Sequence, residues 1–361
     1  MVEQLTRNEQ VRGSSPRGGS KALDIQGGGF DYTVYGKTLI PLYKDCAMRV
    51  VRICVVIFVF SHFFVWAGNN GGGTGFDFLR IDTGARPVSM AGAFVSIIGD
   101  LHGLAYNPAT LVGVRDLEST FTYLNYFVDI KSGFVGLNKT LDGAGHLGLC
   151  VSYINYGEIR RTDIIGENLG SFIPSDFTVT AAYSDSLSMG LRYGVSLKYI
   201  QSKIDQYMSN ALALDIGFIY RISSQDLNIG LCVSNLGSSM KAYIDEGENL
   251  PLTYRLGVSK RLAHLPLLLN FNLIRYQFEE SNLFLGLYWA LGGEFTITDN
   301  FFLRWGYNSR GSEQKVGSDS DRLAGVSLGF GILFRGYRLD YGFSSFGALG
   351  SMNTFTVTIP F

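Results

Sequence analysis

Most of the chain consists of short segments in which apolar side chains alternate with small or polar ones. Between residues 326 and 334, apolar residues hold every second position, and serine or glycine fills most positions between them. The last ten residues repeat the pattern and end in Phe361. Because successive side chains of a strand point to opposite faces, each segment predicts a strand with one apolar face and one small or polar face.

The alternation predicts fourteen strands, and the connections between them are short and longer in turn. Outer-membrane barrels have short periplasmic turns and longer external loops, and an even number of strands returns both ends to the periplasm. The longer connections cover 156–175, 235–251 and 309–321. The predicted strands are 117–124, 132–141, 146–155, 176–184, 188–202, 211–222, 226–234, 252–262, 266–277, 283–297, 301–308, 322–334, 337–344 and 352–361.

A soluble β-sandwich would show the same alternation, and three features favour a membrane barrel instead. The apolar faces are rich in aromatic residues, whereas the opposite faces carry Gly, Ser, Arg and Asp. The connection lengths alternate, and the terminal Phe361 resembles the insertion signal of bacterial outer-membrane barrels. We therefore expect an all-β, transmembrane antiparallel barrel of about 14 strands, inserted by the barrel assembly machinery and surrounded by outer-membrane lipid.

Composition agrees with this class of protein and excludes others. The chain has 361 residues with 17% charged residues, 14% aromatic residues and 45 glycines. These values exclude disorder, collagen and coiled coil. The formal net charge of −1 leaves no basic surface for a nucleic acid, so we expect no nucleic-acid partner.

The N-terminal region divides into an extension and an export signal. Residues 48–67 combine a basic start at Arg49 and Arg52 with an apolar run and an end at Ala67 suited to signal peptidase. We expect cleavage after Ala67; the alternative, a membrane anchor, needs about 20 apolar residues, more than this run supplies. Residues 1–47 are polar and without periodicity, and we interpret them as a misassigned start or a non-structural extension.

Between the signal and the barrel (116–361), residues 68–115 do not follow the strand pattern. Val88 to Ile98 is small and apolar and predicts a short helix, and Asn107 before Pro108 predicts a turn. A compact segment of this kind ahead of a barrel is expected to fold back as a hatch inside it; the alternative is a periplasmic cap that stays outside the lumen.

The predicted strands also place charged side chains on the inward face. We interpret them mainly as a solvated, mutually paired lumen wall, because the interiors of such barrels are polar. Cys150 and Cys232 fall on the same face, and their spacing leaves open whether they pair or stay free. The luminal charges singled out are Arg192, Asp215, Arg255, Arg304, Arg338 and Asp340.

Two runs in the N-terminal segment resemble a known family. Residues 84–94 read GARPVSMAGAF and residues 106–109 read YNPA. Together they resemble the N-terminal signature of the PorV/PorQ-like outer-membrane proteins, which are related to the FadL long-chain fatty acid transporters. The sequence departs from the usual signature at Ala91 and Thr110, and Asp100 alone represents its acidic stretch. The resemblance implies a hatch role for Gly84, Arg86, Gly92, Asn107, Pro108 and Ala109.

The resemblance implies two alternative functions. In the FadL branch, a hydrophobic ligand binds outside, the hatch rearranges, and the ligand leaves without a site for energy coupling. In the PorV branch, the barrel serves protein secretion or assembly. We expect a channel for hydrophobic small molecules, long-chain fatty acids first, with Phe172 and Tyr243 as capture residues. Arg86 could anchor the hatch to a luminal carboxylate such as Asp340.

Nothing in the sequence predicts an enzyme, a cofactor or a metal site. Only four histidines occur, and none falls where it could serve chemistry at the outer leaflet. HExxH and P-loop motifs are absent. The acidic pairs at 245–246 and 319–321 are interpreted as solvated loop charges. The longer loops could also serve surface adhesion, although their length and charge do not argue for a receptor.

Overall fold

The computed structural model describes residues 75–187, 190–243, 248–276 and 286–361. The predicted extension (1–47), the signal peptide (48–67) with its cut after Ala67, and the start of the hatch segment lie outside the described residues. Within the described part of the chain, no helix is long and apolar enough to cross a membrane.

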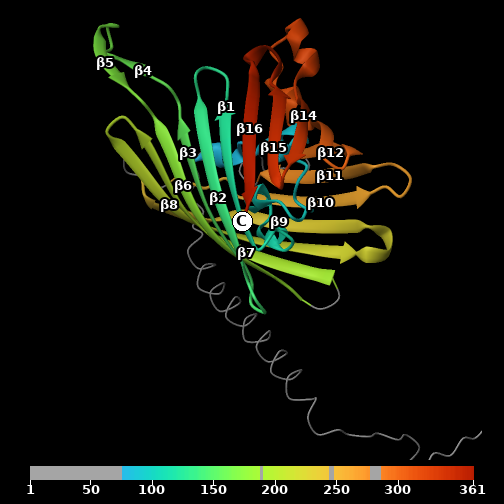
Figure 1. Cartoon of the computed structure of the whole chain (residues 1–361). Coiled ribbons are helices and arrows are strands. Elements are labelled where there is room, and N and C mark those ends of the chain that lie inside the picture. The colour runs from blue at the N-terminus through green and yellow to red at the C-terminus, as the bar shows by residue number, and fades with distance from the viewer. Residues whose placement is uncertain (1–74, 188–189, 244–247, 277–285) are drawn as a thin grey trace, which may run out of the picture. The chain divides into compact units, whose positions relative to one another are not determined.

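Fourteen antiparallel strands form a closed barrel, which confirms the predicted fold class (Figure 1). Consecutive strands are hydrogen-bonded neighbours, and β1 pairs with β16 to close the cylinder. The barrel strands are β1 (Leu117–Asn125), β2 (Lys131–Leu141), β3 (Gly145–Asn155), β6 (Ser175–Ser186), β7 (Leu191–Ile204), β8 (Tyr207–Ile222), β9 (Leu227–Lys241), β10 (Thr253–Arg261), β11 (Leu267–Tyr276), β12 (Leu287–Thr298), β13 (Phe301–Asn308), β14 (Val326–Phe334), β15 (Tyr337–Ser345) and β16 (Ser351–Pro360).

Burial alternates along each strand and identifies the two faces of the wall. In β1, Thr120 and Thr122 are buried, whereas Phe121 and Tyr123 between them are 46% and 50% exposed. The same apolar, exposed face recurs on the other barrel strands. An outer surface made of apolar and aromatic side chains suits lipid rather than water. The chain is therefore an outer-membrane type of β-barrel, and the architecture points to the outer membrane.

Residues 75–115 pack against the inward face of the barrel wall. Their largest side chains, among them Met90, Phe94 and Leu101, are fully buried. Glycines of the wall make room for this backbone: a side chain at Gly230 would overlap with Val95, and one at Gly342 would overlap with Ala85. The short helices of this segment are η1 (Asp77–Arg80), α2 (Ala85–Ser89), η2 (Leu101–Ala105) and η3 (Pro108–Leu111).

The predicted helix over Val88 to Ile98 is wrong for most of its length. The only α-helix of the segment, α2, ends at Ser89. Ala91 and Gly92 follow with φ angles of 53° and 75°. Two successive residues in the left-handed region end a helix, and the chain continues as turns that follow the wall.

Two strand boundaries differ from the prediction because side chains bind nearby backbone. The strand predicted over 322–334 begins only at Val326, since Ser318 and Asp321 form a capping box for the 3₁₀ helix η7 (Asp319–Leu323). The strand predicted to end at 234 continues to Lys241 past a bulge at Asn235, whose φ angle is 64°. Residues 188–189, 277 and 283–285 of other predicted strands lie outside the described residues.

The connection 156–175 contains a hairpin that the alternation did not predict. Strands β4 (Ile159–Thr162) and β5 (Asn168–Phe172) form a separate two-stranded sheet, which extends beyond the barrel in Figure 1. The Asp163 carboxylate accepts hydrogen bonds from the backbone of Ile165 and Glu167 and closes the turn between them. This hairpin marks the long-loop end of the barrel; the opposite end, with Phe361, is the short-turn end.

Candidate functional site

Six ionic side chains, five of them buried and one half-buried, form a closed ring inside the barrel, near its short-turn end. We call this cluster, with members Arg86, Glu294, Arg304, Asp340, Arg338 and Asp100, the ionic ring. Its three guanidinium groups and three carboxylates alternate in sign, so each charge contacts two opposite charges. Two members come from the N-terminal segment, and four come from β12, β13 and β15. The ring therefore ties the segment to the wall.

Arg86 makes the contacts that join the segment to the wall. Its Nε and Nη2 donate to the two carboxylate oxygens of Glu294, both at 2.7 Å, and its Nη1 donates to Asp100 Oδ2 at 3.2 Å. Two parallel hydrogen bonds of this kind fix both distance and orientation. The Asp340 partner suggested from the sequence is wrong, because Glu294 and Asp100 take that position.

The other half of the ring runs along neighbouring strands of the wall. Arg304 donates to Glu294 and to Asp340, each at 2.7 Å. Arg338 donates to Asp340 and to Asp100, also at 2.7 Å. Since every buried charge has opposite partners on both sides, none is left uncompensated, which is the condition under which buried ions are tolerated.

His102 extends the ring to the seam where the barrel closes. Its backbone N–H and its Nδ1 both lie 3.0 Å from Asp100 Oδ1, and its Nε2 lies 2.8 Å from Thr122 Oγ1. Thr122 in turn contacts Thr356 at 2.8 Å, and Thr356 accepts the backbone N–H of Ala85 at 3.0 Å. The segment is thus hydrogen-bonded to β1 and β16, the first and last strands.

The hatch motif glycines occupy positions where a side chain would be strained or would not fit. Gly84 has a φ angle of 88°, and a Cβ atom there would overlap with the His102 ring. Gly92 has a φ angle of 75°, and its Cβ would lie 2.7 Å from Asp82 Oδ1. Both positions therefore need glycine for the backbone conformation and for the space.

Asn107, Pro108 and Ala109 dock the second part of the motif against the wall. The Asn107 amide donates to the backbone oxygens of Val95 at 2.8 Å and of Phe218 on β8 at 3.2 Å, and its Oδ1 accepts the N–H of Ala109. Pro108 begins the helix η3, where its missing N–H costs nothing. Asn107 and Ala109 are fully buried.

Three of the six luminal charges lie outside the ring. Asp215 is buried and binds Lys198 at 2.7 Å, next to the bulge at Asn235. Arg192 is half-buried near the short-turn end, and its Nη1 has no hydrogen-bond partner. Arg255 is 7% exposed, donates to Ser234 at 3.2 Å and lies over the ring of Tyr106. Among the described residues, no carboxylate lies within 4.0 Å of its guanidinium.

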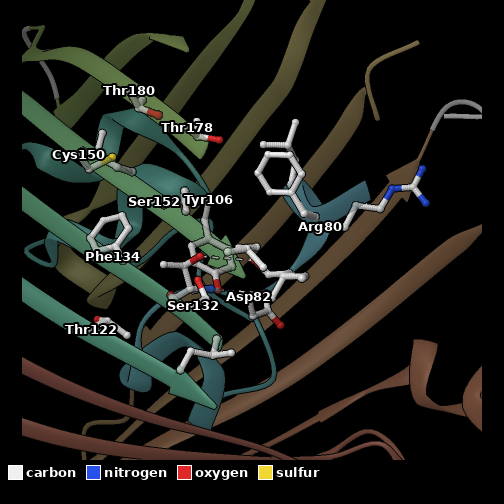
Figure 2. Close-up of a pocket in the computed structure, with 18 of the residues that line it drawn as sticks. Arg80, Asp82, Tyr106, Thr122, Ser132, Phe134, Cys150, Ser152, Thr178 and Thr180 are labelled. Atoms are coloured by element: carbon white, nitrogen blue, oxygen red, sulfur yellow. Dashed lines mark hydrogen bonds between the residues drawn. The ribbon is translucent and has the colours of Figure 1, made fainter. Parts of the chain in front are cut away.

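Two adjoining cavities occupy the space between the segment and the wall. One is lined on the wall side by residues of β1, β2, β3, β6, β7 and β10 (Figure 2). Figure 2 shows Tyr106 and Asp82 pointing toward one another, with their hydrogen bond of 2.9 Å. The other has a volume of about 1240 Å³ and opens toward the long-loop end. Both are lined by Phe78, Asp82, Tyr106 and Arg255, and we call them the inner cavities.

A third cavity, of about 930 Å³, lies at the long-loop end and brings the two predicted capture residues together. Phe172 and Tyr243 both line this outer cavity, although they come from different loops. Phe78 and Tyr156 also line it and border an inner cavity as well. Phe78 is thus common to all three spaces, and capture of a ligand by Phe172 and Tyr243 stays a prediction.

Glu294 is the ring residue that the sequence analysis missed. It is the only charged residue of the predicted strand 283–297 and shares the inward register with Ala290 and Gly292. A lone charged residue at an inward position of a strand could therefore have identified Glu294 from the sequence. Phe361, the predicted insertion signal, is 75% exposed, and its N–H donates to Leu117 O at 3.0 Å.

Comparison with known proteins supports the class that this architecture defines, a fourteen-stranded membrane barrel. The chain is similar to the Pseudomonas putida toluene transporter TodX, at 11% identity and a TM-score of 0.51 over 76% of this chain and 96% of TodX. The toluene transporter TbuX of Ralstonia pickettii (10% identity, TM-score 0.47, 76% and 96% covered) and a FadL homologue of Pseudomonas aeruginosa (11%, 0.46, 76% and 97%) are more distant.

At sequence identities this low, the similarity concerns the fold alone. The comparison with TodX is the one that supports this similarity of fold. No family profile and no curated protein matches the sequence. The resemblance to the PorV/PorQ-like group therefore stays a prediction, as does the hatch role of the segment. The structures named are described as transporters or a FadL homologue, not as enzymes.

Proposed function

We propose that the protein passes hydrophobic small molecules across the outer membrane, with long-chain fatty acids as its main ligand. The observation that carries this proposal is the series of three cavities linked at Phe78. They run from the long-loop end into the barrel and end at the segment held by the ionic ring. Aromatic and other apolar side chains contribute to the lining of each cavity, as in sites for hydrophobic ligands, and TodX, whose fold is similar, is a toluene transporter.

The route in this proposal begins at the outer cavity. A hydrophobic molecule binds among the aromatic side chains there, passes Phe78 and enters the inner cavities. Further passage requires the N-terminal segment to shift, because it fills the lumen at the ionic ring. No group on this route supplies energy, so the flow follows the concentration gradient.

Arg255 is the residue best suited to hold a fatty acid headgroup. Its guanidinium is buried, borders both inner cavities and makes no ion pair within 4.0 Å among the described residues, although the Asp82 carboxylate of the same cavities interacts with it at longer range. A buried charge without an opposite partner is costly, and a ligand carboxylate would supply one. The acyl chain would then extend past Phe78.

Oleate binding to the purified barrel in nonionic detergent tests the proposal. Arg255→Met should weaken binding about tenfold, the effect of removing one charge-assisted contact of roughly 1.5 kcal/mol. Arg322→Met, which removes a cation that is 86% exposed on a loop, should leave binding unchanged. Wild-type protein that binds no oleate, and that co-purifies with a stoichiometric protein partner, would favour the secretion role instead.

A further inference from the structure

The outer cavity differs from the inner ones in the chemistry of its wall. Five aromatic side chains line it: Phe76, Phe78, Tyr156, Phe172 and Tyr243. The faces and hydroxyl groups of such rings attract cations, and several rings around one space form the sites that bind quaternary ammonium groups. The aromatic wall alone, however, would accept a neutral ligand equally well.

A buried carboxylate gives this cavity a negative electrostatic character. Asp176, on β6, is 5% exposed and lines the cavity. It accepts hydrogen bonds from Tyr156 Oη at 2.5 Å and from Ser202, whose hydroxyl group also accepts one from Tyr243. Among the described residues, no cationic side chain lies within 4.0 Å of Asp176. Its charge is thus held by hydroxyl groups alone.

Glu248 adds a second carboxylate to the lining of the same space. Its Oε2 atom is buried without a hydrogen-bond partner. Burial and then the charge of Asp176 raise the pKa of the Glu248 carboxyl above its ordinary value. The two acidic groups therefore influence each other across the cavity, and a cation placed between them would relieve both.

The basic residues near this cavity do not neutralise it. Lys203 contributes to the lining, but it comes from an outward-facing position of β7 and is exposed. Arg161 is paired with Asp205. Asp77, the remaining acidic residue of the lining, lies 3.7 Å from Arg80. Asp176 and Glu248 are consequently the acidic groups that a ligand in the cavity would meet.

We propose that the outer cavity is a binding site for hydrophobic organic cations, such as alkyl or aryl ammonium compounds. The aromatic rings hold the apolar part and the alkyl groups on nitrogen, and Asp176 with Glu248 compensates the charge. This is a second ligand class beside the fatty acids of the proposed function. The two carboxylates favour a cation at this point of the route, whereas Arg255, at the inner cavities, suits an anion.

A pair of ligands of equal shape tests this inference. Benzyltrimethylammonium and its neutral isostere neopentylbenzene differ by one charged atom, and calorimetry in a nonionic detergent gives the affinity of each. The cation should bind about tenfold more tightly to the wild-type barrel, as expected for a desolvated cation–aromatic site with a carboxylate. Asp176→Asn should abolish most of this preference and leave the neutral compound unaffected.

Matched variants separate the site from general effects of charge. Asp319→Asn removes a carboxylate that is 99% exposed on a loop and should not change the preference, and Asp176→Glu should restore most of it. A folded barrel changes its gel migration on heating. If the Asp176→Asn variant lacks this change and is therefore not folded, the Glu248→Gln variant is tested in its place. Equal affinity of the wild type for both ligands would overturn the inference. Oleate binding through Arg255 is measured separately, so the two proposals can fail independently.

Discussion

The ionic ring and the outer cavity use the same kinds of side chain to opposite effect. In the ring, each of three arginines has two carboxylate partners, and the N-terminal segment is tied to the wall. In the outer cavity, Asp176 and Glu248 have no cationic partner among the described residues and face a space of about 930 Å³. Fully paired charges in the ring hold structure together, whereas the carboxylates without an opposite partner in the outer cavity are those to which we assign a ligand.

The largest effect is expected from breaking the ring at Glu294. Glu294→Gln leaves Arg86 and Arg304 without a shared anion, and removing one partner of a buried pair costs about 3–5 kcal/mol. This loss of stability should appear as faster hydrogen–deuterium exchange in residues 84–112 and as higher ion conductance in planar bilayers. Glu313→Gln, at an exposed position that accepts a hydrogen bond from Tyr288, serves as the control.

A double variant tests whether the ring acts through its charges. Arg86→Met combined with Glu294→Met should recover much of the lost protection, because Arg304 keeps Asp340 and Asp100 keeps Arg338. Replacing a buried ion pair by apolar residues is often neutral. If the double variant instead loses as much protection from exchange as the two single variants together, the ring does not work as a unit.

The next effect concerns Phe78, which lies between the two regions. Phe78→Ala should join the outer and inner cavities and raise the uptake of a hydrophobic tracer into proteoliposomes several-fold. Phe76→Ala is the matched control, since Phe76 lines the outer cavity but neither inner cavity. Equal changes in uptake for the two variants would mean that Phe78 does not control the connection.

A smaller effect is expected where the segment touches the wall without charges. Gly217→Ala places a methyl group against the side chain of Asn107, and overpacking of this kind costs about 1–3 kcal/mol. Gly133→Ala meets nothing within 4 Å and should stay within about 0.5 kcal/mol of the wild type. Thermal unfolding of both variants measures the difference, and equal stabilities would contradict the close contact.

The smallest effect is a dependence on pH in the loop before β14. The Asp321 carboxylate accepts N–H groups of Ala348, Ser318, Val316 and Gly317. These hydrogen bonds, first that of Ala348, lower the pKa of Asp321 below 3.8. A lowered pKa contributes stability above 3.8 that is lost as the pH falls through the folded value. Protease resistance of this loop should therefore decrease below about pH 3.8, and Asp321→Asn should show the decrease at neutral pH.

The barrel could be predicted from the sequence because each strand carries its own signal. Alternation over about ten residues fixes which face is apolar, and the strand count follows from repetition. The partner of Arg86 could not be predicted in this way. Glu294 and Asp340 share the inward face, and the choice depends on the depth at which the segment docks.

The outer cavity was predictable in part. Phe172 and Tyr243 were singled out as aromatic loop residues, but their meeting depends on the β4–β5 hairpin and on the loop after β9. Asp176 carried no signal of its own, because a carboxylate at the end of a strand is usually solvated. Its burial arises only when Tyr156 and Ser202 close over it.

The most direct test of the account is a crystal structure with 11-bromoundecanoate, in which the anomalous signal of bromine locates the acyl chain. The account predicts bromine next to Phe78, with the carboxylate at Arg255 and the ionic ring intact. Bromine found only against the exposed apolar residues of the outer surface, with the three cavities free of ligand, would contradict it.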